Sequence, residues 1–349
     1  MHLKDDYLTK NKSKVLKFIG VLLMINLHLF AFPERIKPYT YKSLFLLKEI
    51  PIEYFLAKGS GIAAQIFLFM SGYGMYIQGK MDYKSMLIRI KNIYLEYWLI
   101  FIVFIPLGYY LKVYKFEEKE FFLNFFALKT TYNGEWWFLK VYILQILMYP
   151  ILVYCIDKKS KLMLGIGVLL TFLGMILNKL CQLKGIENIG LSVITNTLIC
   201  YYPFICGIYV AKNKIFTKFS KLKINNKICL FLVIGLIIII QNIKYINYIA
   251  NLFLVPLFIY LLGGLNVEKS KLFLKLSKYT TGIWLVHSFF CYYYFKEIIF
   301  MPKYSILIFI WNIVLSIMVV EIINRIKKYL QFIKLNTPII LIKKCYQQK

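Results

Sequence analysis

Two ionisable residues in the first apolar segment, Lys17 and His28, have the types and spacing for acid–base chemistry inside a membrane. They are the first and last residues of the run KFIGVLLMINLH, and His28 is one of three histidines in the chain. Eleven residues at 100° each bring both side chains to one helix face, roughly 16 Å apart. Because an imidazole exchanges protons near neutral pH, His28 could act as a general base toward a hydroxyl group. A histidine that only hydrogen-bonds a neighbouring helix is an equally open interpretation.

Further candidates lie where a basic segment, GKMDYKSMLIRIKN, leads into the third apolar run. Arg89 and Lys91 would stand at the mouth of that helix, and their cationic groups could hold phosphates. Orientation in the membrane alone would also place them there. Glu96 follows inside the helix and could orient the His28 ring, as the carboxylate of a catalytic triad does, if the two helices are adjacent.

Other landmarks favour structural roles. Gly72, with its neighbour Ser71, is typical of close helix packing, and Trp136 and Trp137 are typical of an interfacial aromatic belt. We expect His287 to be structural. The seven cysteines have no CxxC spacing, so the sequence indicates neither a disulfide framework nor a metal site.

The candidate residues are carried by long apolar segments, as in a membrane protein. Hydrophobic residues make up 60% of the 349, and the mean hydropathy is +0.64. We therefore predict an all-α, polytopic integral membrane protein. Counted against about 20 apolar residues per crossing, the sequence gives about ten transmembrane helices, near residues 15–33, 60–78, 93–114, 136–156, 161–179, 196–211, 228–243, 247–263, 280–296 and 305–323.

The charge pattern predicts the orientation of these spans. Lys and Arg number 44 and Asp and Glu 16, which gives a net charge of +28. The basic residues lie mainly in short segments between apolar runs, so they indicate topology rather than nucleic-acid binding. Alternate loops are basic, which places both termini in the cytoplasm. We predict a multi-pass domain over 1–323 and a basic cytoplasmic tail over 324–349, which could lie along the membrane interface.

Five segments, in this order, resemble motifs of the membrane acyltransferase 3 family. One family motif is a basic residue followed, after ten intervening residues, by a histidine. Lys17 and His28 have this spacing, with lysine where the family usually has arginine. Phe69 to Gly72 (FMSG) match its FlSG. The other similar segments are RIKNIYLEYW, in which Asn92 and Leu95 depart from the usual arginine and proline, WWFLKVYILQILMYPIL and TTGIWLVHSFF.

The resemblance implies an O-acyltransferase of the bacterial cell envelope, located in the inner or plasma membrane. It would move an acetyl or similar acyl group from cytoplasmic acetyl-CoA or another acyl-CoA to a hydroxyl of a surface polysaccharide or lipid-linked saccharide. His28 would be the general base or a transient acyl carrier, with Glu96 as its partner. Lys17, Arg89 and Lys91 would bind the donor. The implied partners are acyl-CoA, the glycan and membrane lipids, without metal or nucleic acid.

Two other classes of protein remain open from the sequence. A polysaccharide transporter or polymerase would also have many spans and basic inner loops. A membrane scaffold would use its histidines for packing only. Binding of coenzyme A discriminates, because neither alternative predicts it.

Overall fold

The chain folds into a bundle of helices in the computed structural model, which describes residues 6–346 except 80–81, 187, 223 and 244–245, and side chains up to residue 329. This confirms the predicted all-α class. The longer helices are α1 (Lys10–Phe30), α4 (Ala63–Ile77), α5 (Tyr83–Tyr110), α7 (Trp137–Leu183), α8 (Ile189–Ile199), α9 (Tyr201–Lys212), α11 (Asn226–Gln241), α12 (Ile246–Gly263) and α16 (Ser305–Tyr346).

Seven helical stretches within the described residues are long and apolar enough to cross a membrane. The predicted total of about ten is not confirmed by that criterion. One reason is α7, whose 47 residues are interrupted at Lys159 by a non-helical backbone (φ −139°, ψ 65°) and cover two of the predicted spans. The other reason is length, because α11 has 16 residues and α14 (Thr280–Ser288) has nine.

Short elements connect the long helices. They are α2 (Pro33–Ile36), α3 (Ile52–Gly59), η2 (Ser60–Ile62), α6 (Glu118–Phe125), η3 (Gly134–Trp136), α10 (Ile215–Phe219), η4 (Val267–Lys269), α13 (Lys271–Leu276), η5 (Ser277–Tyr279), the π-helix η6 (Phe289–Tyr293) and α15 (Lys296–Phe300). Strands β1 (Leu46–Leu47) and β2 (Ile50–Pro51) pair antiparallel. α16 runs continuously across residue 323, and the interfacial placement of 324–349 stays a prediction.

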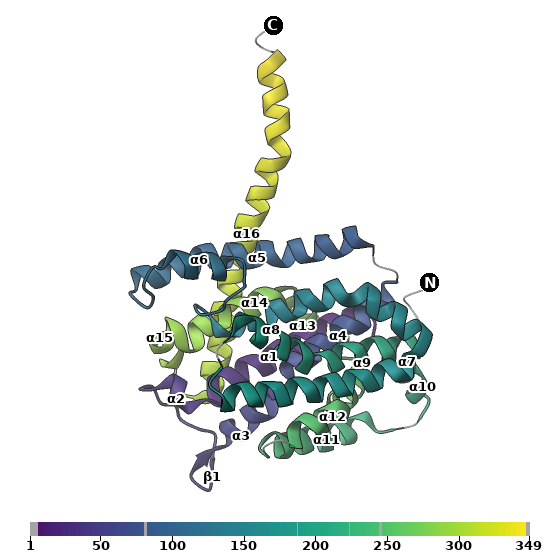
Figure 1. The fold of residues 1–349 in the computed structure, drawn as a ribbon. Coiled ribbons are helices and arrows are strands. Elements are labelled where there is room, and N and C mark those ends of the chain that lie inside the picture. The colour runs from purple at the N-terminus through teal and green to yellow at the C-terminus, as the bar shows by residue number, and fades with distance from the viewer. Residues whose placement is uncertain (1–5, 80–81, 187, 223, 244–245, 347–349) are drawn as a thin grey trace.

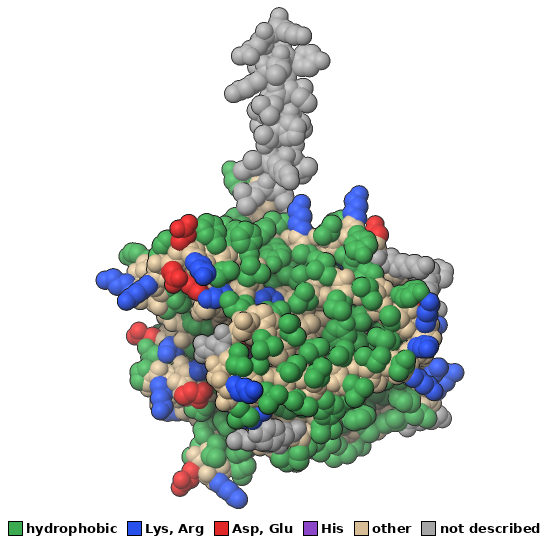
Figure 2. Space-filling view, in the orientation of Figure 1, with side chains coloured by type: hydrophobic (Ala, Val, Ile, Leu, Met, Phe, Trp, Pro, Cys, Tyr) green, Lys and Arg blue, Asp and Glu red, His purple; other side chains and the backbone are tan. Residues whose placement is uncertain are grey.

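The ends of the bundle differ in composition. In Figure 1, α10 lies at the right, while α2, α6, α15 and the β1–β2 hairpin lie at the left. Figure 2 shows apolar side chains over most of the middle of this face, with most of the visible acidic side chains at its left. The exposed apolar residues of α7 include Ile151 and Leu169. We call the right end, which contains α10 and the bend at Lys159, the basic end.

Helix α1 is central to the packing and carries the first candidate residues. Its N-cap is Thr9, whose hydroxyl accepts a hydrogen bond from the Lys12 amide at 3.3 Å. It contacts α3, α4, α14 and α16, and its residues Val21 and Ile25 are fully buried. Thus α1 runs through the interior of the bundle from Lys10, near the basic end, to His28 in its last turn.

Close approach of α4 and α9 depends on two glycines. A Cβ on Gly72 would lie 2.1 Å from the Phe204 carbonyl oxygen, and one on Gly207 would lie 2.1 Å from the Phe69 carbonyl oxygen. No real side chain tolerates such contacts. The predicted packing role of Gly72 is therefore confirmed.

Candidate active site

His28 and Glu135 form a hydrogen-bonded pair at the C-terminal end of α1, away from the basic end of the bundle. The His28 Nε2 lies 3.0 Å from the Glu135 Oε2, and His28 is only 6% exposed. Glu135 belongs to η3, the short helix that leads into α7. The Asn133 side chain caps η3 by accepting a hydrogen bond from the Glu135 amide at 3.1 Å.

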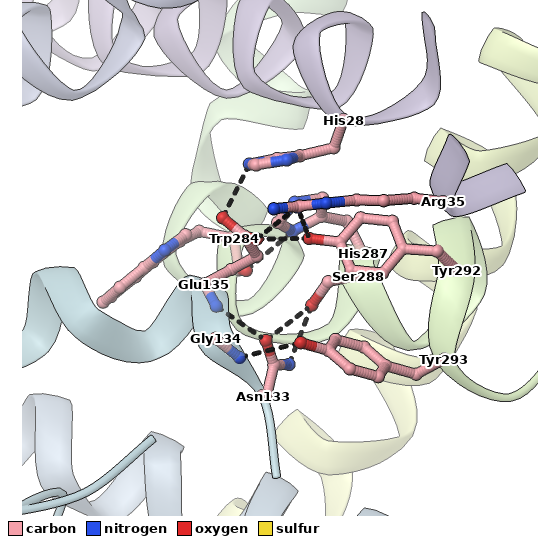
Figure 3. Close-up of polar contacts among 10 residues, drawn as sticks. All are labelled: His28, Arg35, Asn133, Gly134, Glu135, Trp284, His287, Ser288, Tyr292 and Tyr293. Atoms are coloured by element: carbon pink, nitrogen blue, oxygen red, sulfur yellow. Dashed lines mark hydrogen bonds and ion pairs between the residues drawn. The ribbon is translucent and has the colours of Figure 1, made fainter. Parts of the chain in front are cut away.

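Two more groups fix the other oxygen of Glu135. The Arg35 guanidinium donates to Oε1 at 3.2 Å, and the Tyr292 hydroxyl also donates to Oε1. Arg35 stacks in turn against the rings of Phe32 and Tyr292, 4.4 and 5.3 Å from their centroids. Figure 3 shows Glu135 between His28 on one side and Arg35 with Tyr292 on the other. The carboxylate is therefore held in one orientation from three directions.

The proton positions on His28 follow from this pairing. An ionised carboxylate can only accept hydrogen bonds, so Nε2 of His28 carries a proton. In the neutral ring, Nδ1 then holds the free electron pair. That Nδ1 is buried and has no hydrogen-bond partner among the described residues. A base whose second nitrogen is oriented by a carboxylate has this arrangement, so the pair is able to accept a proton at Nδ1.

A second imidazole lies beside the first. The ring centroids of His28 and His287 are 5.2 Å apart. Nδ1 of His287 lies 2.8 Å from the Trp284 carbonyl oxygen, and its buried Nε2 has no partner among the described residues. His287 thus contacts the site, while its predicted structural role stays a prediction.

Hydrogen bonds from α14 and η6 hold the segment that carries Glu135. The Asn133 amide donates to the Ser288 hydroxyl at 2.7 Å, and the Gly134 amide donates to the Tyr293 hydroxyl at 2.8 Å. The indole nitrogen of Trp136 donates to the Leu285 carbonyl at 3.0 Å, and the side chain is fully buried. The expected interfacial role of Trp136 is therefore wrong, because this indole is packed inside the bundle.

The His28–Glu135 pair faces a small, mostly apolar cavity of about 170 Å³. Its walls include Met24 and Leu27 of α1 and Ala63 and Ala64 of α4. Phe67, Phe138 and Trp284 also line it. We call this space the His28 cavity.

A larger cavity of about 510 Å³ opens near the basic end, and we call it the basic cavity. Its cationic residues come from three helices: Lys14 and Lys17 of α1, Arg89 of α5 and Lys327 of α16. Glu96 is the only carboxylate among its described lining residues. Phe67, Phe138 and Trp284 line this cavity too, so the same three aromatic side chains border both spaces.

The predicted site residues separate into two groups. Lys17 and Arg89 line the basic cavity, whereas Lys91 is exposed and is not among its lining residues. Glu96 lines the basic cavity as well, so the expectation that it pairs with His28 needs correction. The carboxylate on the His28 ring is Glu135.

Sequence reasoning missed Glu135, Arg35 and Tyr292. The available signal for Glu135 was a lone carboxylate, in NGEWW, directly before a long apolar run. No group of three or more potential metal-binding side chains occurs among the described residues.

Comparison with known proteins identifies the sequence family. The sequence model of the Acyltransferase domain matches residues 11–323. No curated protein and no solved structure matches the chain. The matched region contains His28, Glu135 and every other residue of the pair's surroundings.

Proposed function

We propose, since the chain belongs to the acyltransferase 3 family, that it moves an acetyl or similar acyl group from a cytoplasmic acyl-CoA to a hydroxyl group of a cell-surface polysaccharide or lipid-linked glycan. Family membership and apolar helices make it a membrane acyltransferase. The donor, the acceptor and the base are the proposed elements.

The observation that carries the proposal is the adjacency of the two cavities. A cation-lined space at one end and the His28–Glu135 pair toward the other share the walls Phe67, Phe138 and Trp284. An acyl thioester on a long flexible arm could place its phosphates in the first space and its carbonyl in the second. Along α1, eleven residues from Lys17 to His28 give roughly 16 Å for that arm to cover.

Charge favours a polyphosphate donor in the basic cavity. Lys14, Lys17, Arg89 and Lys327 face one carboxylate, Glu96. Coenzyme A carries several phosphate groups, and Arg binds phosphate in a bidentate way while Lys supplies a point charge. The positive-inside rule assigns this end to the cytoplasm, where acyl-CoA is available.

The proposed chemistry uses His28 as general base. Nδ1 removes the acceptor hydroxyl proton while the oxygen attacks the thioester carbonyl. The carbon–sulfur bond then breaks, and the departing thiolate takes the proton from His28, so atoms and charge balance. Glu135 stabilises the imidazolium that forms in between. In the alternative course, Nδ1 attacks the thioester carbonyl, the coenzyme A thiolate leaves, and His28 carries the acyl group until the acceptor hydroxyl attacks it and gives its proton to the thiolate.

His28→Ala tests this function. Purified protein in lipid nanodiscs would be given radiolabelled acetyl-CoA, and release of coenzyme A and transfer to glycan would be followed. We expect wild type to transfer the label and His28→Ala to lose at least about 10²-fold, the usual contribution of a positioned base. The control is His2→Ala, outside the described residues. Undiminished transfer by His28→Ala at matched folding would remove His28 from the mechanism.

In cells, mass spectrometry of the surface polysaccharide gives the matching test. We expect polysaccharide from cells that express wild type to carry acyl groups that are absent when His28→Ala is expressed at the same level. An unchanged polysaccharide on deletion of the gene would contradict a glycan acceptor.

A further inference from the structure

A third cavity, of about 640 Å³, lies at the end of the bundle opposite the basic end, and we call it the outer cavity. The segment before η3, the last turns of α7 and the first turns of α8 form it. Cavities of this size hold small-molecule ligands. None of its residues takes part in the chemistry proposed for His28.

Polar side chains reach this cavity in helical register. Asn178 and Gln182 are four residues apart on α7, so they share a face. On α8, Ser192 and Thr195 follow its N-cap residue Asn188 at spacings of four and three. Both helices are otherwise rich in apolar residues, with LGMILNKLCQL at the end of α7. Helix surfaces that face lipid are usually apolar. Two polar helix faces directed at one cavity therefore indicate a polar ligand.

The balance of charge in the outer cavity is positive among its described lining residues. Lys129 is neutralised by Glu120, whose pKa is lowered by the hydrogen bond from Lys129. Lys140 has no such partner in the described part of the chain, and its ammonium group donates to the Leu128 carbonyl at 3.0 Å. None of the described residues that line this cavity is a carboxylate. One lysine therefore remains available to pair with an anion.

Residues that line the outer cavity also flank Glu135 in the sequence. Thr131, in its wall, is four residues before Glu135, and Lys140 is five residues after it. Asn133, between them, caps η3 and bonds Ser288. A ligand held against 129–140 would thus lie against the same segment that carries Glu135.

We propose that the outer cavity binds the acceptor, and that the acceptor is a saccharide bearing an anionic group, a carboxylate or a phosphate, that faces Lys140. This inference rests on the proposed function in that the bound sugar would be the one that His28 deprotonates. Amide side chains can both donate and accept hydrogen bonds, as sugar hydroxyls require. A coenzyme A molecule would instead need several cations, which the basic cavity has.

Cys181 supplies a direct probe, because it lines the cavity, is partly exposed and is a free thiol. The full chain in nanodiscs would be labelled with a hydrophilic maleimide, without any acyl donor, and the rate at Cys181 measured by peptide mass spectrometry. The probes are tetragalacturonate, neutral maltotetraose and glycerol 1-phosphate, which represents a phospholipid headgroup. Cys181→Ser defines the background.

We expect tetragalacturonate to protect Cys181 at lower concentrations than either other probe. Lys140→Gln should raise the concentration needed at least tenfold, since a charge-assisted hydrogen bond is lost. Gln182→Ala should also weaken protection, and Lys115→Gln, which changes an exposed lysine outside the cavity, should not.

Three outcomes would overturn the proposal. They are no protection by tetragalacturonate, equal protection by maltotetraose, or protection by glycerol 1-phosphate alone, which would make this a lipid-headgroup site. The test does not depend on the proposed function, because no acyl donor is present. Saccharide protection without any acetyl-CoA turnover would therefore contradict the proposed function and leave the saccharide site intact.

Discussion

Replacing Glu135 by glutamine removes the negative charge beside His28 with almost no change in shape. At the 3.0 Å separation of Oε2 and Nε2, two unit charges at an effective dielectric constant of about 20 interact by about 5.5 kcal/mol. Arg35 and Tyr292 already compensate part of the carboxylate charge. We therefore expect between half and all of that energy to be lost from the transition state that contains the imidazolium. This corresponds to a fall in kcat of roughly 10² to 10⁴.

The assay is steady-state transfer from acetyl-CoA by nanodisc-embedded protein, with the donor affinity measured separately. Because Glu135 is not in the basic cavity, the donor Kd should stay within about threefold of wild type, so the loss appears in kcat. Glu34→Gln, which changes an exposed carboxylate in α2, is the matched control. A Glu135→Gln protein that folds and retains a kcat within a few-fold of wild type would refute the pairing as the source of catalysis.

Two further predictions concern the donor and the packing. Arg89→Ala should weaken acetyl-CoA binding roughly 10- to 100-fold by calorimetry, since it removes from the basic cavity a cation that we propose binds phosphate. Lys91→Ala should leave the Kd unchanged, and equal Kd values for both variants would contradict the phosphate role. Gly72→Ala should lower the unfolding temperature in nanodiscs because its Cβ would lie 2.1 Å from a backbone oxygen. Gly74→Ala meets no atom within 4 Å and should not, so equal melting of the two would argue against this close packing.

The fold class and the position of His28 could be predicted because local chemistry determines them. Apolar runs of sufficient length become helices in a membrane, whatever else they contact. An ionisable residue in such a run is conspicuous on its own. The break in α7 at Lys159 could also be predicted, since the basic segment DKKSK separates two apolar runs there.

The partner of His28 could not be predicted because it depends on which helix ends meet. Glu135 is 107 residues away from His28 in the chain and follows a loop rather than lying inside a span. Glu96 had the more typical position, inside an apolar helix, but that position lies on the wall of the basic cavity. Trp136 was misjudged for a related reason. Its neighbours in sequence suggest a membrane boundary, whereas α14 covers it in three dimensions.

The cation set of the basic cavity was only partly visible in the sequence. The sequence indicated Lys17 and Arg89 as candidates because of their positions at helix ends. Lys14 and Lys327 could not be distinguished from lysines that only set the orientation in the membrane. Only the packing of α16 against α5 brings Lys327 to the same space. Lys91, adjacent in sequence to the lining residue Asn92, points elsewhere because neighbouring positions on a helix differ by 100°.

The most direct test is a cryo-electron microscopy structure with an acetyl-CoA analogue whose sulfur is replaced by a methylene group, so that the acetyl carbonyl is kept but cannot be transferred. We predict phosphates against Lys17 and Arg89, and the carbonyl carbon in the His28 cavity within about 6.5 Å of the His28 Nδ1. That distance is the sum of an attack distance of roughly 3.5 Å and a hydrogen bond of about 3 Å. An analogue whose acetyl group stops short of Phe138 and Trp284, or whose phosphates lie outside the basic cavity, would contradict it.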